Sequence, residues 1–132
     1  MERPKVERKP GRILYRELGY QVQGVLHNVF YALGPGFREE TYRRAVIKTL
    51  QTQGIPFETE KTFDIVYRGE VIDQYRLDIV VDGKIVLELK AVDELHPRFE
   101  AQLLSYLRAS GLHLGLLVNF GSNKLQIIRR VM

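Results

Sequence analysis

Two apolar runs on either side of Asp82-Gly83 constrain the fold of this chain more than any other feature of its sequence. An Asp-Gly pair between apolar runs is a strong signal for a β-hairpin. In both runs the apolar residues hold odd-numbered positions, and a strand sends alternate side chains to opposite faces. These residues are Leu77, Ile79 and Val81 in the first run and Ile85, Leu87, Leu89 and Ala91 in the second. The sequence therefore predicts a hairpin whose strands each have one apolar face.

The length of the connecting loop decides whether the two apolar faces meet. A two-residue loop would pair Val81 with Lys84 and set apolar side chains beside charged ones. A three-residue loop, Val81-Asp82-Gly83, would pair Val80 with Lys84 and keep odd-numbered residues beside odd-numbered residues. Gly83 would then take the left-handed backbone conformation that such loops need. Because the buried face sets the register, we predict the three-residue loop.

The predicted register gathers three charged side chains, those of Asp78, Glu88 and Lys90, on the even-numbered face. Mg²⁺ binds one or two carboxylates and keeps several waters, so Asp78 and Glu88, helped by the Leu89 carbonyl, could bind this ion. Lys90 could orient or activate a bound water and offset developing negative charge. The alternative is a solvated strand face with ordinary charges. Glu88 and Lys90 interrupt one of the most apolar stretches of the chain, which favours the metal site.

Composition places the chain among globular proteins of one-domain size, with 132 residues of which 45% are hydrophobic. The absence of cysteine excludes disulfides, thiolate zinc sites and cysteine nucleophiles. No apolar run is long enough to span a bilayer and nothing resembles a signal peptide, so we expect a soluble, cytoplasmic protein. The formal charge of +4 mildly favours nucleic-acid binding. We divide the chain into a basic mobile arm at residues 1–12 and a single domain at residues 13–132.

Hydrophobic periodicity predicts helices over residues 13–33, 37–53 and 97–111. Antiparallel strands are expected to form a meander from residue 56, through a turn at residues 68–70, into the central hairpin. The very apolar run at residues 112–120 predicts an inner or parallel strand, and residues 124–131 predict a final edge strand.

Helical spacing also assigns faces to polar residues outside the hairpin. Glu39 shares the inward side of its helix with Tyr42, whereas Glu40 faces outward. Glu39 is therefore either a third acid aimed at the metal site or a first-turn acid favoured by the helix dipole. Gln102 and Tyr106 are four residues apart and share a face of their helix. This spacing suits a structural hydrogen-bonded pair.

Asp78 followed by Glu88-Leu89-Lys90 resembles the D…E-x-K core of the PD-(D/E)XK nuclease superfamily, with Leu77 where the superfamily name has proline. The expected order of elements is similar to the α-β-β-β-α-β core shared by restriction endonucleases and Holliday-junction resolvases. The fold class that this implies is α/β with a mixed, α+β-type sheet: a restriction-endonuclease-like core with an extra N-terminal helix.

Four blocks of sequence resemble the GxxExxY proteins, a branch of that superfamily. They are G-x-x-E-x-x-Y at residues 36–42, E-L-K-A within residues 86–91, Q-L-x-x-Y-L at residues 102–107 and L-x-N-F-G within residues 116–121. The resemblance extends over roughly residues 14–131, and four blocks in the same order are much more specific than any one of them.

The resemblance implies a nuclease that uses Mg²⁺ or Mn²⁺ to hydrolyse phosphodiester bonds of nucleic acid, with DNA as the favoured substrate. Carried across by position, Asp78 and Glu88 match the metal ligands and Lys90 the catalytic lysine. Glu39 matches the helical acid, which is also an optional metal ligand. Gln102 and Tyr106 match a Q-x-x-x-Y motif that supports the site or contacts substrate in related exonuclease-like branches.

Two functions without catalysis stay open. One is a nucleic-acid-binding module that retains the nuclease fold, and the other is a protein-interaction or scaffold module, which could be a homodimer. Binding alone needs basic groups and not clustered acids, so the acids favour the enzyme. Both DNA and RNA, and both endonuclease and exonuclease action, are compatible with the sequence.

Overall fold

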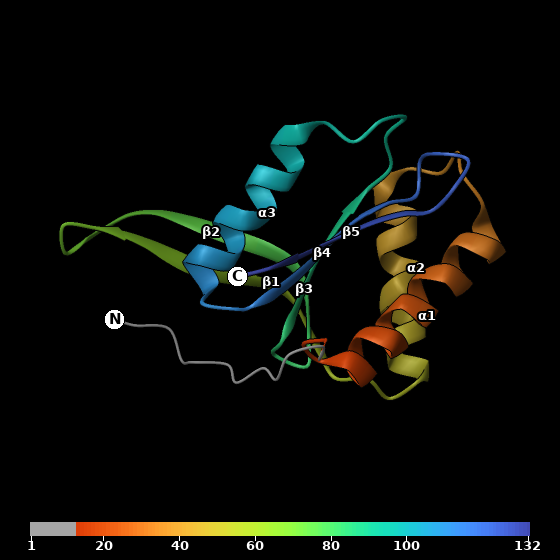
Figure 1. Ribbon diagram of the computed structural model, residues 1–132, viewed down its shortest axis with the longest axis horizontal. Helices are drawn as coiled ribbons and strands as arrows, with labels where there is room; N and C mark the ends of the chain where they lie inside the picture. The colour runs from red at the N-terminus through yellow and green to blue at the C-terminus, as the bar shows by residue number, and fades with distance from the viewer. Residues whose placement is uncertain (1–12) are drawn as a thin grey trace.

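The computed structural model describes residues 13–132, so the arm predicted at residues 1–12 lies outside the described residues. The helices are α1 (Arg16–Leu33), α2 (Glu39–Thr52) and α3 (Pro97–Ser110). The strands are β1 (Phe57–Tyr67), β2 (Glu70–Val81), β3 (Ile85–Lys90), β4 (Leu114–Asn119) and β5 (Gln126–Val131). The predicted fold class, a restriction-endonuclease-like core with an extra N-terminal helix, is confirmed (Figure 1).

The five strands form one mixed sheet in the order β1-β2-β3-β4-β5. The first three are antiparallel neighbours, so the predicted meander is confirmed. Strand β4 is parallel to β3 and antiparallel to β5, which makes β5 an edge strand as predicted. Every residue of β4 is buried, because this inner strand is covered on both faces.

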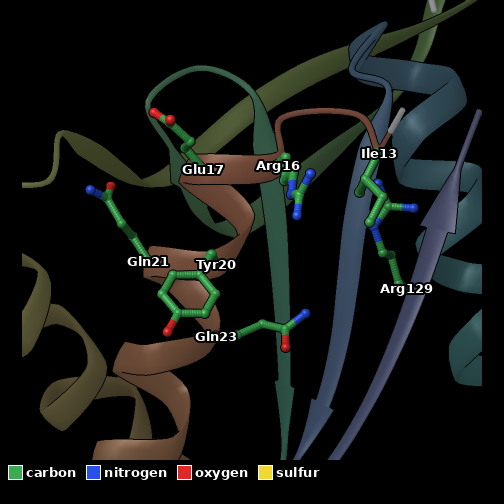
Figure 2. A pocket seen from close by; sticks show the side chains of 7 residues that line it. All are labelled: Ile13, Arg16, Glu17, Tyr20, Gln21, Gln23 and Arg129. Carbon is green, nitrogen blue, oxygen red and sulfur yellow. The ribbon is translucent and has the colours of Figure 1, made fainter. Parts of the chain in front are cut away.

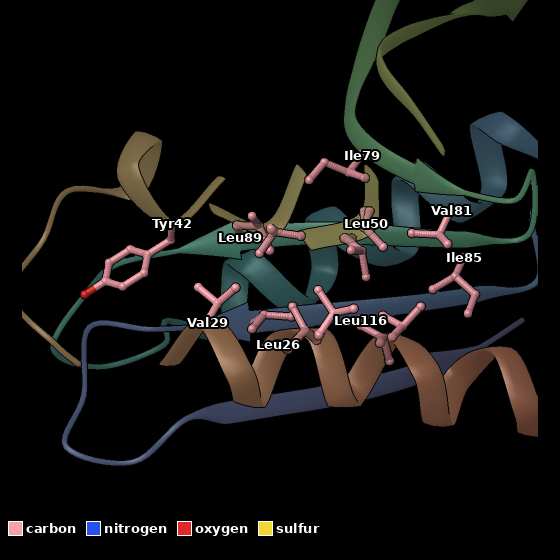
Figure 3. Packing of buried hydrophobic residues seen from close by; sticks show 14 of the residues in the cluster. Leu26, Val29, Tyr42, Leu50, Ile79, Val81, Ile85, Leu89 and Leu116 are labelled. Atoms are coloured by element: carbon pink, nitrogen blue, oxygen red, sulfur yellow. The ribbon is translucent and has the colours of Figure 1, made fainter. Parts of the chain in front are cut away.

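Helices α1 and α2 cover one face of the sheet, and α3 covers the other (Figure 1). The larger apolar core lies between α1, α2 and the odd-numbered side chains of the central hairpin (Figure 3). The smaller core lies under α3 and includes Val80, Val86, Leu103, Leu107 and Leu117. Val80 and Val86 are therefore fully buried, and the face predicted to be mixed is apolar wherever α3 packs on it.

The central hairpin pairs odd-numbered residues with odd-numbered residues, as predicted, but with another loop. The structure pairs Val81 with Ile85, so the three loop residues are Asp82, Gly83 and Lys84. Asp82 and Gly83 have φ of 50° and 63°, and the Lys84 N–H donates to the Val81 carbonyl at 2.9 Å. Positive φ at both central residues defines a type I′ turn. The tight turn thus uses two residues, and Lys84 is the extra residue that restores the match between the faces.

Leu77 does not follow the predicted alternation, because it packs in the core under α3, with Val80 and Val86. The pairing of β2 with β3 ends at Ile79, and beyond that residue β2 pairs with β1. In β1, Glu60 has a positive φ of 55°, a local departure from extended backbone where the strand passes Asp78. The faces of β2 therefore exchange near Asp78, at the place where β2 separates from β3.

The helix ends agree with the sequence prediction to within three residues, and the largest difference is at the start of α1. Helix α1 begins at Arg16, after Tyr15 with φ of 51°. Helix α3 starts at Pro97, where the missing N–H costs nothing, and the side chain of His96 accepts from the Arg98 N–H. No helix within residues 13–132 has the combination of length and apolar composition that crossing a membrane requires.

Candidate active site

The candidate site lies at the end of β3, where β2 turns away from it. Ile79 and Leu87 form the last residue pair between these strands, and Asp78, Glu88 and Lys90 follow just beyond. The backbone N–H of Asp78 donates to the Glu88 carboxylate. Asp78 and Glu88 are therefore neighbours in the structure, although ten positions separate them in the sequence.

Glu88 is a buried acid, with 8% of its surface exposed. Burial raises the pKa of Glu88 to about 7, with repulsion from Asp78 and Glu39 adding to the rise and attraction by Lys90 opposing it. A carboxylate held this far from water lacks full compensation for its charge. The environment of Glu88 therefore favours an arriving cation.

Glu39 is the first residue of α2 and is the third acid considered for the site. Partial burial of its carboxyl raises the pKa of Glu39, although the residue as a whole is exposed. Among charged groups, Lys90 has the largest influence on it, and Asp78 follows. Glu39 thus feels the charges of the hairpin, but it is more exposed than Glu40, the reverse of the prediction for the two residues. Within residues 13–132 it does not form a three-acid cluster with Asp78 and Glu88.

Arg43 is a site residue that the sequence reasoning missed. Its guanidinium Nε donates to Asp78 Oδ1 in an ion pair, and both side chains are mostly buried. Desolvation opposes this pair, yet the hydrogen bond and the attraction of Asp78 leave the pKa of Arg43 raised. Arg43 lies four residues after Glu39 on the same helix, so helical spacing could have indicated it.

Lys90 reaches toward α3 and not toward α2. Its Nζ lies 4.6 Å from the centre of the Phe99 ring, and the guanidinium carbon of Arg98 lies 5.4 Å from the same ring. These three residues and Gln102 line a groove of about 410 Å³. The groove therefore presents a second cation, Arg98, and an aromatic ring next to Lys90.

Gln102 and Tyr106 form the predicted pair on one face of α3. The Gln102 side chain hydrogen-bonds to the Tyr106 hydroxyl, and the Tyr106 ring packs edge-on against Tyr75 at 5.4 Å. Burial raises the pKa of Tyr106, and the charge of Glu88 raises it further. The pair therefore lies close enough to Glu88 to sense its charge, with Gln102 exposed at the groove.

Tyr42 fixes the start of α2. Its hydroxyl donates to the Gly34 carbonyl at 2.5 Å and accepts from the Phe37 N–H at 3.2 Å, which ties down the α1–α2 loop. Its ring stacks on Phe120 with centroids 4.6 Å apart. In the G-x-x-E-x-x-Y block the tyrosine is thus structural, and it holds the helix end that carries Glu39.

Asn119 and Gly121 fix the segment that follows Lys90. Buried Asn119 bonds to both the N–H and the carbonyl of Val92, at 2.9 and 2.8 Å. A Cβ at Gly121 would lie 2.4 Å from the Val92 nitrogen, so only glycine fits there. The Phe120 N–H donates to the Lys90 carbonyl at 2.9 Å. The N-F-G block therefore holds the end of β3 in place, a role that the sequence alone did not indicate.

The carboxylate oxygens of Asp78 and Glu88 suit a magnesium or manganese ion that keeps several water ligands. Within residues 13–132, no three His, Asp or Glu side chains lie close enough together to hold an ion without other ligands. Two carboxylates with water and a backbone carbonyl are nevertheless an ordinary magnesium environment. The buried Glu88 beside Asp78 provides that chemistry, and Glu39 stands near but does not complete a three-acid cluster.

A larger pocket, of about 600 Å³, lies between the start of α1 and strand β5 (Figure 2). Its lining residues are Ile13, Arg16, Glu17, Tyr20, Gln21, Gln23 and Arg129. It holds one acid, and its position apart from the hairpin charges makes it a poor candidate for a metal site.

Comparisons with known proteins agree with this fold. A family model described as the PD-(D/E)XK nuclease superfamily matches residues 16–131. Among solved structures, the crystal structure of SSO0001 is similar, with a TM-score of 0.58 and 21% sequence identity. The similarity covers 88% of this chain and 61% of that chain, and at this identity it supports the fold alone. No curated protein matches the chain.

Proposed function

The chain belongs to the PD-(D/E)XK nuclease superfamily, and we propose that it is a metal-dependent nuclease that hydrolyses phosphodiester bonds of nucleic acid, with DNA as the expected substrate. The observation that carries this proposal is the buried Glu88 carboxylate beside Asp78, with Lys90 close enough to act on its charge. A module that only bound nucleic acid would gain nothing from this acid, because a buried negative charge repels phosphate.

We propose further that residues 13–132 form one nuclease domain of the GxxExxY branch. The contacts of two motif blocks support this assignment, since each of these two blocks fixes a different side of the same site. Tyr42 holds the helix that carries Glu39, and Asn119 holds the segment after Lys90. These contacts give a physical reason for the residue types in two of the four blocks.

In this proposal Asp78, Glu88 and the Leu89 carbonyl bind Mg²⁺ or Mn²⁺, with Glu39 close enough to bind a water ligand. When bound, the metal would supply an acidified water and offset negative charge on the phosphate. Lys90 donates to the attacking water or to a phosphate oxygen and stabilises charge that develops in the transition state. Its Nζ stays on the groove side because it rests against Phe99.

The groove beside Lys90 is the proposed path of the substrate. Arg98 can bind a phosphate next to the one that is cut, and Gln102 can donate a hydrogen bond at the edge of the groove. Tyr106 keeps Gln102 in place through their hydrogen bond. None of these contacts reads a base, so we expect cleavage without strong sequence specificity.

The test is a cleavage assay with Mg²⁺ or Mn²⁺ on single-stranded, double-stranded and branched DNA and on RNA, together with calorimetric titration of Mn²⁺. We expect wild-type cleavage that chelation abolishes, and loss of both cleavage and Mn²⁺ binding in Asp78→Asn. The matched control is Asp82→Asn, which removes a carboxylate that pairs only with Lys84 on the exposed turn. Absence of both cleavage and Mn²⁺ binding in the wild type would favour the scaffold alternative instead.

A further inference from the structure

Glu60 lies opposite Asp78 on the neighbouring strand, in a backbone conformation that glutamate seldom adopts. Thr59 pairs with Ile79, and the next residue pair between β1 and β2 starts at Lys61. Glu60 lies between these pairs and faces Asp78. Its φ of 55° is in the left-handed region, which residues that have a Cβ rarely occupy. Such outliers gather at functional sites, which makes Glu60 a candidate for a role beyond the fold.

The conformation of Glu60 coincides with the crossing of both strands between the two cores. Phe57, before Glu60, packs against the core of α1 and α2, whereas Phe63, after it, packs against the core under α3. Both residues have odd numbers and would share a face in a regular strand. Strand β2 exchanges its faces at Asp78, in the same place. The two acids are therefore held opposite each other where the strands cross.

The guanidinium of Arg43 lies among three acids. Its Nε donates to Asp78 Oδ1, and its Nη1 lies 3.7 Å from Glu40 Oε1. Glu60 also acts on this guanidinium, since its charge is one of those that raise the pKa of Arg43. One cation is thus shared by acids from α2, β1 and β2.

Of these three acids, Glu60 is the one without an ion pair. Asp78 holds the Nε of Arg43, and Glu40 also accepts from Arg44 Nε at 3.1 Å. Within residues 13–132, no ion pair involves the Glu60 carboxylate. Glu60 can therefore accept Arg43 without giving up another partner.

We propose that Glu60 is a positioning residue of the metal site, which takes the Arg43 guanidinium from Asp78 when a divalent cation binds. The inference rests on the proposed metal binding by Asp78 and Glu88. A cation at Asp78 competes with Arg43 for the same carboxylate and repels the guanidinium. Arg43 donates only its Nε to Asp78, so its terminal nitrogens are available for Glu60.

Glu60 acts on the metal site through Arg43 and not by its own charge. The charged groups that shift the pKa of Glu88 are Lys90, Asp78 and Glu39. Glu60 is not one of them, although it acts on Arg43. Removal of the Glu60 charge should therefore change metal affinity only while Arg43 is present. Coupling of this kind appears as non-additive effects of two substitutions.

The first experiment is calorimetric titration of Mn²⁺ into wild type, Glu60→Gln, Arg43→Gln and the double variant. We expect Glu60→Gln to raise the dissociation constant about five- to tenfold, because Arg43 then stays on Asp78. In the Arg43→Gln background the same change should alter it less than about twofold. The control Glu58→Gln removes a carboxylate two residues earlier on β1, where it pairs with Lys61, and should bind like the wild type.

The second experiment follows the Arg43 Nε–H signal by NMR, with Arg43→Gln to assign it. We expect Glu60→Gln to shift this signal in saturating Mg²⁺ and to leave it nearly unchanged in chelator, because Glu60 holds Arg43 only in the metal-bound protein. Urea unfolding in chelator should also be nearly unchanged, which a merely structural role of Glu60 would not allow.

Two outcomes would overturn the inference and can be told apart. A wild type that binds no Mn²⁺ would reject the proposed metal site and the role of Glu60 together. A wild type that binds Mn²⁺ would reject only the role of Glu60 if Glu60→Gln left the affinity unchanged. An equal loss of affinity with and without Arg43 would do the same, because Glu60 would then act by its own charge.

Discussion

Replacing Glu88 by glutamine should make the metal-free protein more stable at neutral and alkaline pH. Glutamine keeps the size of the side chain and can still accept from the Asp78 N–H, but it carries no charge. The wild-type carboxylate must ionise in a buried place beside other acids, which costs stability. The substitution removes this cost and leaves the packing nearly unchanged.

The size of the stabilisation expected for Glu88→Gln follows from the pKa of Glu88. Glu88 titrates at about 7 in the folded protein against the ordinary value of 4.5. Each pKa unit corresponds to about 1.36 kcal/mol, so the rise from 4.5 to about 7 makes ionisation of Glu88 cost about 3 kcal/mol at pH 8.5. For a chain of 132 residues this equals a shift in Tm of about 11 °C.

The direction of the pH dependence of stability also follows from the raised pKa of Glu88. Between about pH 4.5 and 7 the folded state binds the Glu88 proton more tightly than the unfolded state does, so this group makes wild-type stability fall as pH rises. Below pH 4.5 the carboxyl is protonated in both states and its contribution to the difference between the proteins disappears. Glu88→Gln should therefore match the wild type near pH 4.5 and exceed it increasingly up to about pH 8.

The assay is urea unfolding followed by circular dichroism from about pH 4.5 to 8.5, in chelator, on wild type, Glu88→Gln and the control Asp82→Asn. The control removes an exposed carboxylate and should show a small difference that does not change through this window. Added Mg²⁺ should stabilise the wild type and not the Glu88→Gln variant, since it binds the folded state through this acid. A stability difference that is the same at pH 5 and pH 8.5, or that favours the wild type at pH 8.5, would refute the reasoning.

Four further changes test other parts of the site. Lys90→Met should reduce cleavage by orders of magnitude, equivalent to about 2.7–4 kcal/mol, while calorimetric Mn²⁺ affinity survives; an unchanged cleavage rate would reject the role of this lysine. Arg43→Gln should tighten Mn²⁺ binding in calorimetry, because it removes a cation that competes for Asp78, and weaker binding would mean that Arg43 aligns Asp78 for the metal. Tyr42→Phe should cost about 1–2 kcal/mol in urea unfolding, since two hydrogen bonds of the α1–α2 loop are lost, and no loss would contradict its structural role. Asn119→Ala should cost about 2–4 kcal/mol in the same measurement, because it leaves buried backbone groups without partners, and a cost below about 1 kcal/mol would mean that water replaces the side chain.

Local pattern determined much of this protein from the sequence alone. Strand alternation and the Asp-Gly pair were enough to predict the central hairpin and its odd-to-odd pairing, because side-chain direction repeats every two residues. Periodicity gave the three helices, and the sequence blocks gave the superfamily. Asp78, Glu88 and Lys90 could be grouped in advance because they lie on two adjacent strands, where pairing fixes which residues meet.

Only the tertiary structure decided how the layers meet around these charges. Leu77 left its predicted face because β2 separates from β3 beyond Ile79, and strand separation depends on twist and on the helices that pack there. The Arg43–Asp78 ion pair joins residues 35 positions apart, and the contact of Lys90 with Phe99 joins a strand to the next helix. Such contacts depend on how helices and strands pack against one another. Packing between elements leaves no periodic pattern in the sequence, unlike the alternation of side chains in a strand.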